Sequence, residues 1–252
     1  MTGPALSAAQ APVALFISDL HLQPEMPATT AAFLHFLQQQ ASKASQLYLL
    51  GDIFEYWAGD DDLDSPFPQR IVQALRHLSD KGVQLYWMAG NRDFLVSQAF
   101  ATATGATLLP DPYILTHAGQ RLVLTHGDQL CTDDSAYQQF RLQVRQPAWQ
   151  AAFLARSLAE RKAIIAGMRM QSQQHQQQVS ALIMDVNTEA VASLFASSGA
   201  DVLIHGHTHR PDVHSSEQRR RYVLSDWDCD STTPRGDWLA LMADGSLLRN
   251  KV

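Results

Sequence analysis

Short apolar runs recur along the chain, and a Gly, Asp, Asn or His residue follows each of them closely. The runs are rich in β-branched and aromatic residues and have polar residues or glycine at their ends, which is typical of buried strands. They occupy residues 13–17, 46–50, 83–88, 121–125 and 201–204. We therefore predict five buried β-strands.

Helical patterns lie between several of these runs. Segment 30–42 carries Phe33, Leu34 and Leu37 on one face, and segments 69–81 and 186–197 show the same spacing. Strands that alternate with helices predict an α/β layered fold. Two later strand candidates, 222–225 and 238–242, have no helix between them and indicate a partly antiparallel second sheet.

The polar residues that follow the runs are candidates for a metal site. In open α/β sheets, ligand sites form beyond the carboxyl ends of the strands, so these residues should converge. Asp19 and His21 are two residues apart and should point to the same side, as should His207 and His209. The full candidate ligand set is Asp19, His21, Asp52, Asn91, His126, His207 and His209.

This set of oxygen and nitrogen donors suits Mn²⁺, Fe²⁺, Co²⁺ or Zn²⁺. Seven side chains are too many for one tetrahedral ion, and they fit two ions with Asp52 as the bridge. Two ions about 3.5–4 Å apart can hold a bridging hydroxide and neutralise a phosphoryl group during in-line attack. Arg92 offers a forked donor for phosphate oxygens. The predicted catalytic residues are Asp52, Asn91, Arg92 and His126.

Each motif alone also has an ordinary structural explanation, because Gly-Asp after a strand is frequently a turn or a helix cap. Five such sites in order at strand ends favour the metal centre. The size and composition agree with one large domain over residues 1–252, since 46% of the 252 residues are hydrophobic.

Charge and targeting signals limit the classes of partner. A net charge of −6 argues against a protein that binds nucleic acid over its whole surface. Cys131 and Cys229 are far apart, which predicts two free thiols in a reducing cytoplasm. Residues 1–12 lack a basic region followed by an apolar run, so we expect no signal peptide. No apolar stretch approaches the roughly 20 residues that span a bilayer.

Residues 133–184 form an insertion that looks helical and separate from the core. Within it, residues 141–170 hold six basic residues and one acidic residue, which gives +5, and apolar residues lie among them. An apolar and basic helical lid suits a substrate with acyl chains and phosphates, and suits anionic lipid. The alternative is a helical hairpin that packs its apolar face on the core.

The chain resembles the calcineurin-like metallophosphoesterase superfamily. The resemblance lies in Asp19-Leu20-His21, Gly51-Asp52, Gly90-Asn91-Arg92-Asp93, His126-Gly127-Asp128 and Gly206-His207-Thr208-His209, over about residues 17–211. It implies two packed mixed β-sheets flanked by helices, with a dinuclear centre at one edge. Asp19, His21, Asp52 and His209 would hold one ion, and Asp52, Asn91, His126 and His207 the other.

Within that superfamily, blocks 18–22, 51–55, 90–94, 183–187 and 205–211 are similar to the UDP-2,3-diacylglucosamine hydrolases of lipid A biosynthesis. This resemblance implies a pyrophosphatase that releases UMP and 2,3-diacylglucosamine 1-phosphate (lipid X) with a hydroxide activated by two metal ions, expected to be Mn²⁺. It further implies a monomer that does not bind nucleic acid. This monomer would be a cytoplasmic protein that associates with an anionic membrane surface, the cytoplasmic face of the inner membrane. The alternatives are another metal-dependent hydrolase of nucleotide polyphosphates or phosphodiesters, or a non-enzymatic scaffold.

The same resemblance implies a set of substrate contacts near the metal centre and in the lid. They are Asn91, Arg92, Asp134, Tyr137, Arg169, Ser172, Gln176, Val179 and His207. Where the family usually has a lysine, this chain has Val179.

Overall fold

The computed structural model describes residues 11–178, 185–216 and 218–252, with backbone alone for residues 170–178. The helices are α1 (Pro27–Gln39), α2 (Pro66–Asp80), α3 (Gln98–Thr104), α4 (Ser135–Val144), α5 (Pro147–Leu154), α6 (Leu158–Gln178) and α7 (Thr188–Ser198). Three short 3₁₀ helices are η1 (Ala41–Lys43), η2 (Asp60–Asp62) and η3 (Asp128–Leu130). The strands are β1 (Ala14–Ile17), β2 (Gln46–Leu50), β3 (Gln84–Met88), β4 (Ala106–Leu109), β5 (Tyr113–His117), β6 (Gln120–Leu124), β7 (Val202–His205), β8 (Asp212–Ser216), β9 (Arg219–Val223), β10 (Asp237–Leu241) and β11 (Leu247–Lys251).

These strands form two mixed sheets. The first sheet has the order β11-β10-β1-β2-β3-β4, and the second has the order β5-β6-β7-β9-β8. Strands β1 to β4 run parallel to one another, whereas β10 is antiparallel to both of its neighbours. In the second sheet, β6, β7 and β9 are parallel, and β5 and β8 close the two edges antiparallel to them.

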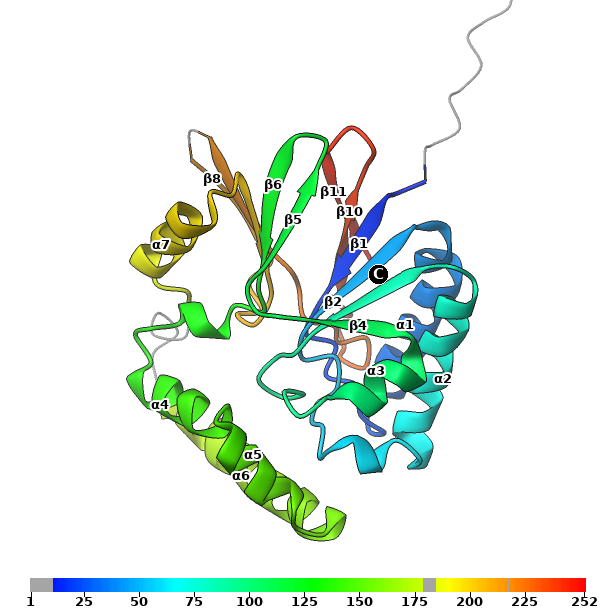
Figure 1. Cartoon of the computed structure of the whole chain (residues 1–252), viewed down its shortest axis with the longest axis vertical. Coiled ribbons are helices and arrows are strands. Elements are labelled where there is room, and N and C mark those ends of the chain that lie inside the picture. The colour runs from blue at the N-terminus through cyan, green and yellow to red at the C-terminus, as the bar shows by residue number, and fades with distance from the viewer. Residues whose placement is uncertain (1–10, 179–184, 217) are drawn as a thin grey trace, which may run out of the picture.

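The two sheets pack face to face, with helices on the outer faces (Figure 1). Alternation along β1 explains the layers, because Leu15 and Ile17 face the cluster under α1 and α2 while Phe16 faces the cluster between the sheets. A third, smaller cluster joins the outer face of the second sheet to α7 through Phe195. The predicted fold of two packed mixed sheets flanked by helices is therefore confirmed.

The predicted strands and helices are found close to their expected bounds, with one correction. Strand β9 overlaps segment 222–225 and pairs antiparallel with β8 in the second sheet, as expected. Segment 238–242 instead overlaps β10, which lies in the first sheet antiparallel to β1. The pairing of Leu239 with Phe16 brings this strand to β1, where Leu239 and Leu241 help to fill the space between the sheets.

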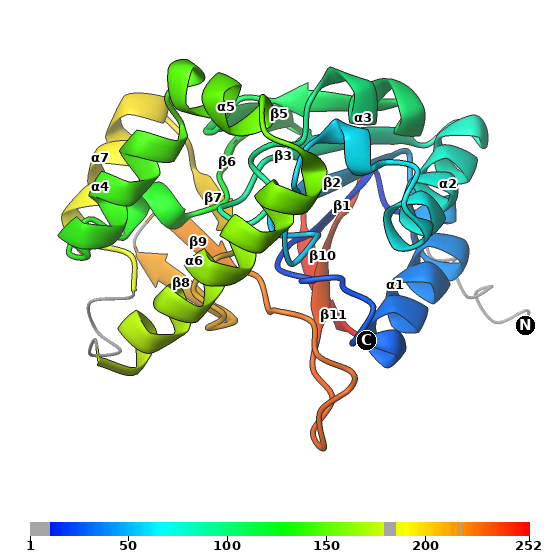
Figure 2. The ribbon, with the colours of Figure 1, turned by 90° about the horizontal axis from the view of Figure 1, so that it is seen from below.

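Helices α4, α5 and α6, here called the helical insertion, lie across one end of the two sheets (Figures 1 and 2). Phe153 is buried in the core under the first sheet, and Trp149, Ile164 and Ile165 pack against that core. The insertion therefore has the core packing that the hairpin alternative predicted. Residues 179–184, the last part of the predicted insertion, lie outside the described residues. Among the helices in the described part of the chain, none combines the length and apolarity that a membrane crossing requires.

Candidate metal centre

The candidate ligands come together at the end of the sheets that the helical insertion covers. Asp19 and His21 follow β1, Asp52 follows β2, Asn91 follows β3, His126 follows β6, and His207 and His209 follow β7. Among the described residues, two groups of potential ligand atoms lie close enough to hold a cation: Asp19, His21 and His209 form one, and Asp19, Asp52 and His126 form the other.

The backbone is strained at these residues. In the described part of the chain, six non-glycine residues have a positive φ, and five of them are candidate ligands: Asp19 (55°), His21 (48°), Asp52 (54°), His207 (66°) and His209 (54°). A left-handed backbone at a non-glycine residue costs about 1–3 kcal/mol, and such strain clusters at functional sites. The turns after β1, β2 and β7 are therefore shaped by the site at the expense of local stability.

Two glycines give the carboxylates room. A Cβ atom on Gly206 would overlap the Asp19 carboxylate, and a Cβ atom on Gly90 would overlap the Asp52 carboxylate. The sequence motifs thus need glycine at these positions, because the backbone at Gly206 closely approaches Asp19 after β1 and the backbone at Gly90 closely approaches Asp52 after β2.

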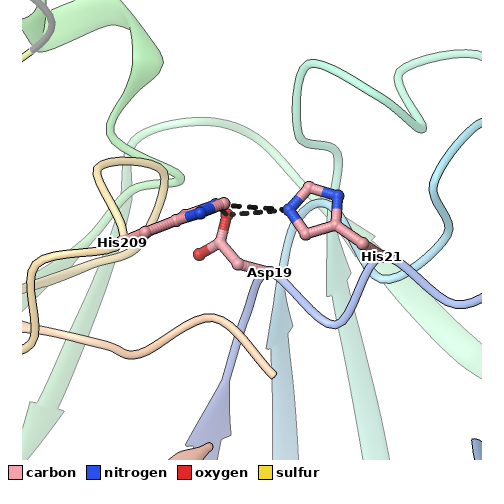
Figure 3. Close-up of side chains that lie close together, drawn as sticks. All are labelled: Asp19, His21 and His209. Carbon is pink, nitrogen blue, oxygen red and sulfur yellow. Dashed lines mark hydrogen bonds and ion pairs between the residues drawn. The ribbon is translucent and has the colours of Figure 1, made fainter. Parts of the chain in front are cut away.

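The first group centres on the buried carboxylate of Asp19 (Figure 3). One oxygen, Oδ2, accepts hydrogen bonds from the Ser18 hydroxyl at 2.5 Å and from the His207 backbone amide at 2.9 Å. The other oxygen, Oδ1, has no hydrogen bond within the described residues. It lies 4.0 Å from His21 Nε2 and 3.5 Å from His209 Nε2, and these two nitrogens are 3.2 Å apart. A cation among the three atoms would satisfy all of them.

Asn91 lies next to the second group, against His126. Its Oδ1 atom lies 2.9 Å from His126 Nε2 and 2.9 Å from His207 Nδ1. Asp52 Oδ1 is 3.7 Å from the same His126 nitrogen. The other ring nitrogen of His126, Nδ1, lies 2.9 Å from the Leu50 carbonyl oxygen, which accepts its proton and fixes the ring with Nε2 toward the site.

The electrostatics of the site favour positive charge. Burial alone would lower the pKa of His126, but the carboxylates of Asp52, Asp19 and Asp128 outweigh it and raise this pKa to about 9. Burial would raise the pKa of Asp19, yet His209 and the other nearby imidazoles hold it well below its usual range. Burial and the charge of His126 lower the pKa of His207 to about 4. Asp19 is therefore ionised and His207 neutral at neutral pH, as a divalent cation needs, whereas His126 must lose a proton before it can bind one.

These observations fit two divalent ions, in agreement with the donor chemistry. Asp19 belongs to both groups of close ligand atoms, whereas Asp52 belongs to one. One Asp52 oxygen also accepts a hydrogen bond of 2.7 Å from the Arg92 amide. The bridging role expected for Asp52 stays a prediction, and Asp19 is a second carboxylate placed to share both positions.

A cavity of about 280 Å³ opens beside the centre. Asn91, Arg92 and Arg169 line its polar part, and Tyr137 lies on its wall. The remaining wall is mainly apolar and includes Phe94, Leu95, Phe140, Trp149, Phe153, Ile165 and Met168. Side chains from the helical insertion thus enclose, together with the metal-facing loops, a space with one polar and one apolar part.

The other expected substrate contacts are placed differently. Asp134 caps α4 and accepts a hydrogen bond of 2.9 Å from the Tyr137 amide. Ser172 and Gln176 lie on α6, where the side chains are outside the described part of the structure, and Val179 lies outside the described residues altogether. Their predicted contacts with substrate therefore stay predictions.

Sequence reasoning missed two buried carboxylates that support the ligand loops. Asp128 accepts hydrogen bonds from the Tyr137 hydroxyl at 2.8 Å and from Arg141 Nε at 2.7 Å. Asp93 accepts hydrogen bonds from the amides of Gly90 and Ile53 at 2.8 and 2.9 Å, and burial and the Asp52 charge raise its pKa to about 6. Each lies two residues beyond a candidate ligand, Asp93 after Asn91 and Asp128 after His126, and this spacing is the sequence signal that could have identified them.

The basic residues of the helical insertion face acidic groups of the core. Ion pairs join Arg141 and Arg145 to Asp128, Arg161 to Asp61, Lys162 to Asp62, and Arg169 to Glu55. Arg145 also donates to the Gly90 carbonyl oxygen at 2.8 Å, next to Asn91. Five of the six cations counted in the sequence therefore pair with carboxylates outside the insertion.

Comparison with known proteins agrees with this geometry. The family described as Calcineurin-like phosphoesterase matches residues 13–211. A protein from Aromatoleum aromaticum named UDP-2,3-diacylglucosamine hydrolase is 49% identical to this chain, over 89% of this chain and 93% of that protein. A protein of the same name from Bordetella pertussis is also 49% identical, over 90% of this chain and 91% of that protein. A protein of the same name from Ralstonia nicotianae is 44% identical over 99% of this chain and 98% of its own. The matched region contains every candidate metal ligand, and the chain belongs to the calcineurin-like phosphoesterase family, whose members are metal-dependent hydrolases.

Proposed function

We propose that this protein hydrolyses the pyrophosphate bond of UDP-2,3-diacylglucosamine to UMP and 2,3-diacylglucosamine 1-phosphate. The observation that carries the proposal is the cavity beside the metal centre, where Arg92 and Arg169 offer cationic groups to phosphates and aromatic side chains of the insertion offer an apolar wall. A nucleotide-linked sugar with acyl chains needs both environments in one space. The names of relatives at 44–49% identity support the same substrate.

The proposed metal ligands are the seven residues identified from the sequence, and the proposed ions are two Mn²⁺. The orphaned Asp19 oxygen and the converging imidazole nitrogens support a cation at the first position, and the Asn91, His126 and His207 cluster supports one at the second. Such ions, when bound, would activate water as a nucleophile and neutralise charge on the phosphoryl group.

The protein's own groups would bind and orient the substrate. Arg92 lies beside Asn91 on the cavity wall, and its guanidinium can form two parallel hydrogen bonds to phosphate oxygens. Arg169 comes from α6, and both guanidinium groups lie near the same Glu55 oxygen, with Arg92 Nη1 at 4.0 Å and Arg169 Nη2 at 2.8 Å, so the two could bind the pyrophosphate together. His126 and His207 face Asn91 from the second sheet and would fix the end of the site near the reacting phosphorus.

We further propose that residues 133–184 act as a lid within a single domain of residues 1–252. Apolar side chains of α5 and α6 on the cavity wall support a role in holding acyl chains and in excluding water. The exposed side chains of Phe140, Leu142 and Leu154 support contact with a membrane surface, at the cytoplasmic face of the inner membrane.

Hydrolysis of UDP-2,3-diacylglucosamine tests the proposal, with UMP release followed in the presence of Mn²⁺ and of Mn²⁺ plus excess chelator. We expect UMP release that the chelator abolishes and that fresh Mn²⁺ restores. Failure to release UMP, together with metal-dependent cleavage of bis(p-nitrophenyl) phosphate, would keep the metal centre and reject the lipid substrate.

A further inference from the structure

Glu55 lies between the metal centre and the helical insertion. Its backbone amide donates to the Leu22 carbonyl oxygen at 3.2 Å, and the preceding residue, Phe54, pairs with Leu22 in an isolated parallel bridge. The Glu55 side chain is 12% exposed. The loop that carries this carboxylate is thus tied to the loop that carries His21.

The two oxygens of Glu55 contact different elements. Oε2 lies 2.8 Å from His21 Nδ1, and Oε1 lies 2.8 Å from Arg169 Nη2. Arg92 Nη1 is farther away, 4.0 Å from Oε1. One carboxylate therefore bridges a candidate metal ligand after β1 and a cavity-lining guanidinium on α6.

The contact with His21 can decide which ring nitrogen faces the centre. His21 Nδ1 has no hydrogen bond of good geometry in the described structure, so its 2.8 Å contact with Glu55 Oε2 is an electrostatic one. The negative charge favours a proton on Nδ1, which leaves Nε2 with a free lone pair toward Asp19 and His209. The backbone of His21 has a φ of 48°, so the local chain does not favour this placement by itself. A partner that holds the ring is the physical requirement of such a site.

The contact with Arg169 can fix the insertion side of the cavity. The Arg169 guanidinium lies 5.8 Å from the centroid of the Tyr56 ring and 3.4 Å from Gln23 Oε1, both of which are weaker restraints than the ion pair. With Glu55 in place, this long side chain has one defined position beside Asn91 and Arg92 instead of many.

We propose that Glu55 is a positioning residue that orients His21 for metal binding through one oxygen and holds Arg169 of the helical insertion through the other. The state of the insertion and the affinity of the first metal position are then linked by a single side chain. This inference deepens the proposed function by adding a link between its substrate-binding and metal-binding groups.

Two conservative variants distinguish the positioning of His21 and Arg169 by Glu55 from the effect of its negative charge alone. Glu55→Gln keeps the length but replaces one acceptor oxygen with an NH₂ donor, so it can accept from His21 or from Arg169 but not from both. Glu55→Asp keeps the charge but is shorter by one methylene, so it can reach one partner at a time. The matched control is Glu25→Gln, which changes an exposed glutamate four residues after His21, in the segment between β1 and α1.

The first measurement is Mn²⁺ binding to the metal-free protein by isothermal titration calorimetry, without substrate. We expect both Glu55 variants to raise the Kd for Mn²⁺ about ten-fold or more, because partners of metal-ligating histidines typically contribute 10- to 100-fold. Glu25→Gln should stay within about two-fold of the wild type by the same measure. Loss of affinity in Glu55→Gln alone, with Glu55→Asp unchanged, would assign the effect to charge and overturn positioning, as would unchanged affinity in both.

A double-mutant cycle tests the link to the insertion. The change in Mn²⁺ affinity caused by Arg169→Met is measured in the wild type and in the Glu55→Gln background. If the positive charge of Arg169 acted on the metal directly, Arg169→Met would change the Mn²⁺ affinity equally in the two backgrounds. If the effect passes through Glu55, Arg169→Met changes the affinity in the wild type and has no effect in the Glu55→Gln background. Equal effects in both backgrounds would overturn the link. Metal binding is read without substrate, so an absence of UMP release by the wild type would reject the proposed function and leave this test valid.

Discussion

Arg161 is the main buried anchor of the helical insertion, and its replacement should loosen α6. The side chain is 2% exposed although it carries a charge. Its Nη1 donates to the buried Ala58 carbonyl oxygen at 2.5 Å, and its Nη2 pairs with Asp61. Ile165 and Met168 on the same helix line the cavity, so the anchor also sets one wall of the proposed substrate site.

The loss of local stability expected for Arg161→Met can be calculated from these contacts. The hydrogen bond to Ala58 involves a charged donor and a buried acceptor and contributes about 1.5–3 kcal/mol. The Asp61 side chain is 59% exposed, so that ion pair is screened and adds at most about 0.5 kcal/mol. Arg161 Nε is buried without a hydrogen bond in the described structure, and its removal returns about 1 kcal/mol. The net local destabilisation is about 2 kcal/mol.

Hydrogen exchange measures this local stability directly. We expect the amides of α6 that lie before residue 169 to exchange about 30-fold faster in Arg161→Met, since 2 kcal/mol corresponds to that ratio. The KM for the acylated substrate should rise while kcat changes less, because the metal centre is untouched. Arg76→Met is the control, since Arg76 forms an exposed i,i+4 pair with Asp80. Exchange within about three-fold of the wild type, or an equal effect of the control, would refute the reasoning.

Three further results are expected. Asp52→Ala should abolish measurable UMP release while the protein stays folded by circular dichroism; a near-normal rate would remove Asp52 from the centre. Trp149→Ala, which removes a ring stacked on Phe153 in the cavity wall, should raise KM about ten-fold for the acylated substrate and leave cleavage of bis(p-nitrophenyl) phosphate unchanged. Burial raises the pKa of Cys131 to about 12, so only about 10⁻⁴ of this thiol is ionised at pH 8. A disulfide reagent should therefore modify Cys229 first, and the reaction of Cys131 should become faster as the pH rises. Rapid modification of both thiols in the native protein would contradict this.

The ligand positions could be predicted because local sequence and topology point to the same edge. Each apolar run ends where the chain must turn, and parallel neighbours bring such ends together, so Asp52 and Asn91 meet without any knowledge of the register. The placement of β10 could not be predicted in the same way. Its residues suit either sheet, and the choice depends on the pairing of Leu239 with Phe16, which lies more than two hundred residues away.

The role of Glu55 was beyond sequence reasoning for a related reason. A glutamate after Gly-Asp-Ile-Phe reads as an ordinary polar residue at a strand end. Its function depends on the contact with Arg169, which exists only when α6 folds back across the sheets. The positive φ angles at His21 and His209 were equally hidden, because imidazole side chains carry no local preference strong enough to predict a left-handed backbone.

The distribution of charge explains how the insertion and the core fit together. The whole chain carries −6 and residues 141–170 carry +5, which leaves −11 on the rest. An acidic core that gathers carboxylates for cations also attracts the basic insertion, and Asp128 shows both effects, since it raises the pKa of His126 and pairs with Arg141. Five of the six cations of the insertion are thus paired with carboxylates outside it. Attraction to a membrane must then depend more on its exposed apolar side chains, such as Leu142, than on the basic composition that first suggested it.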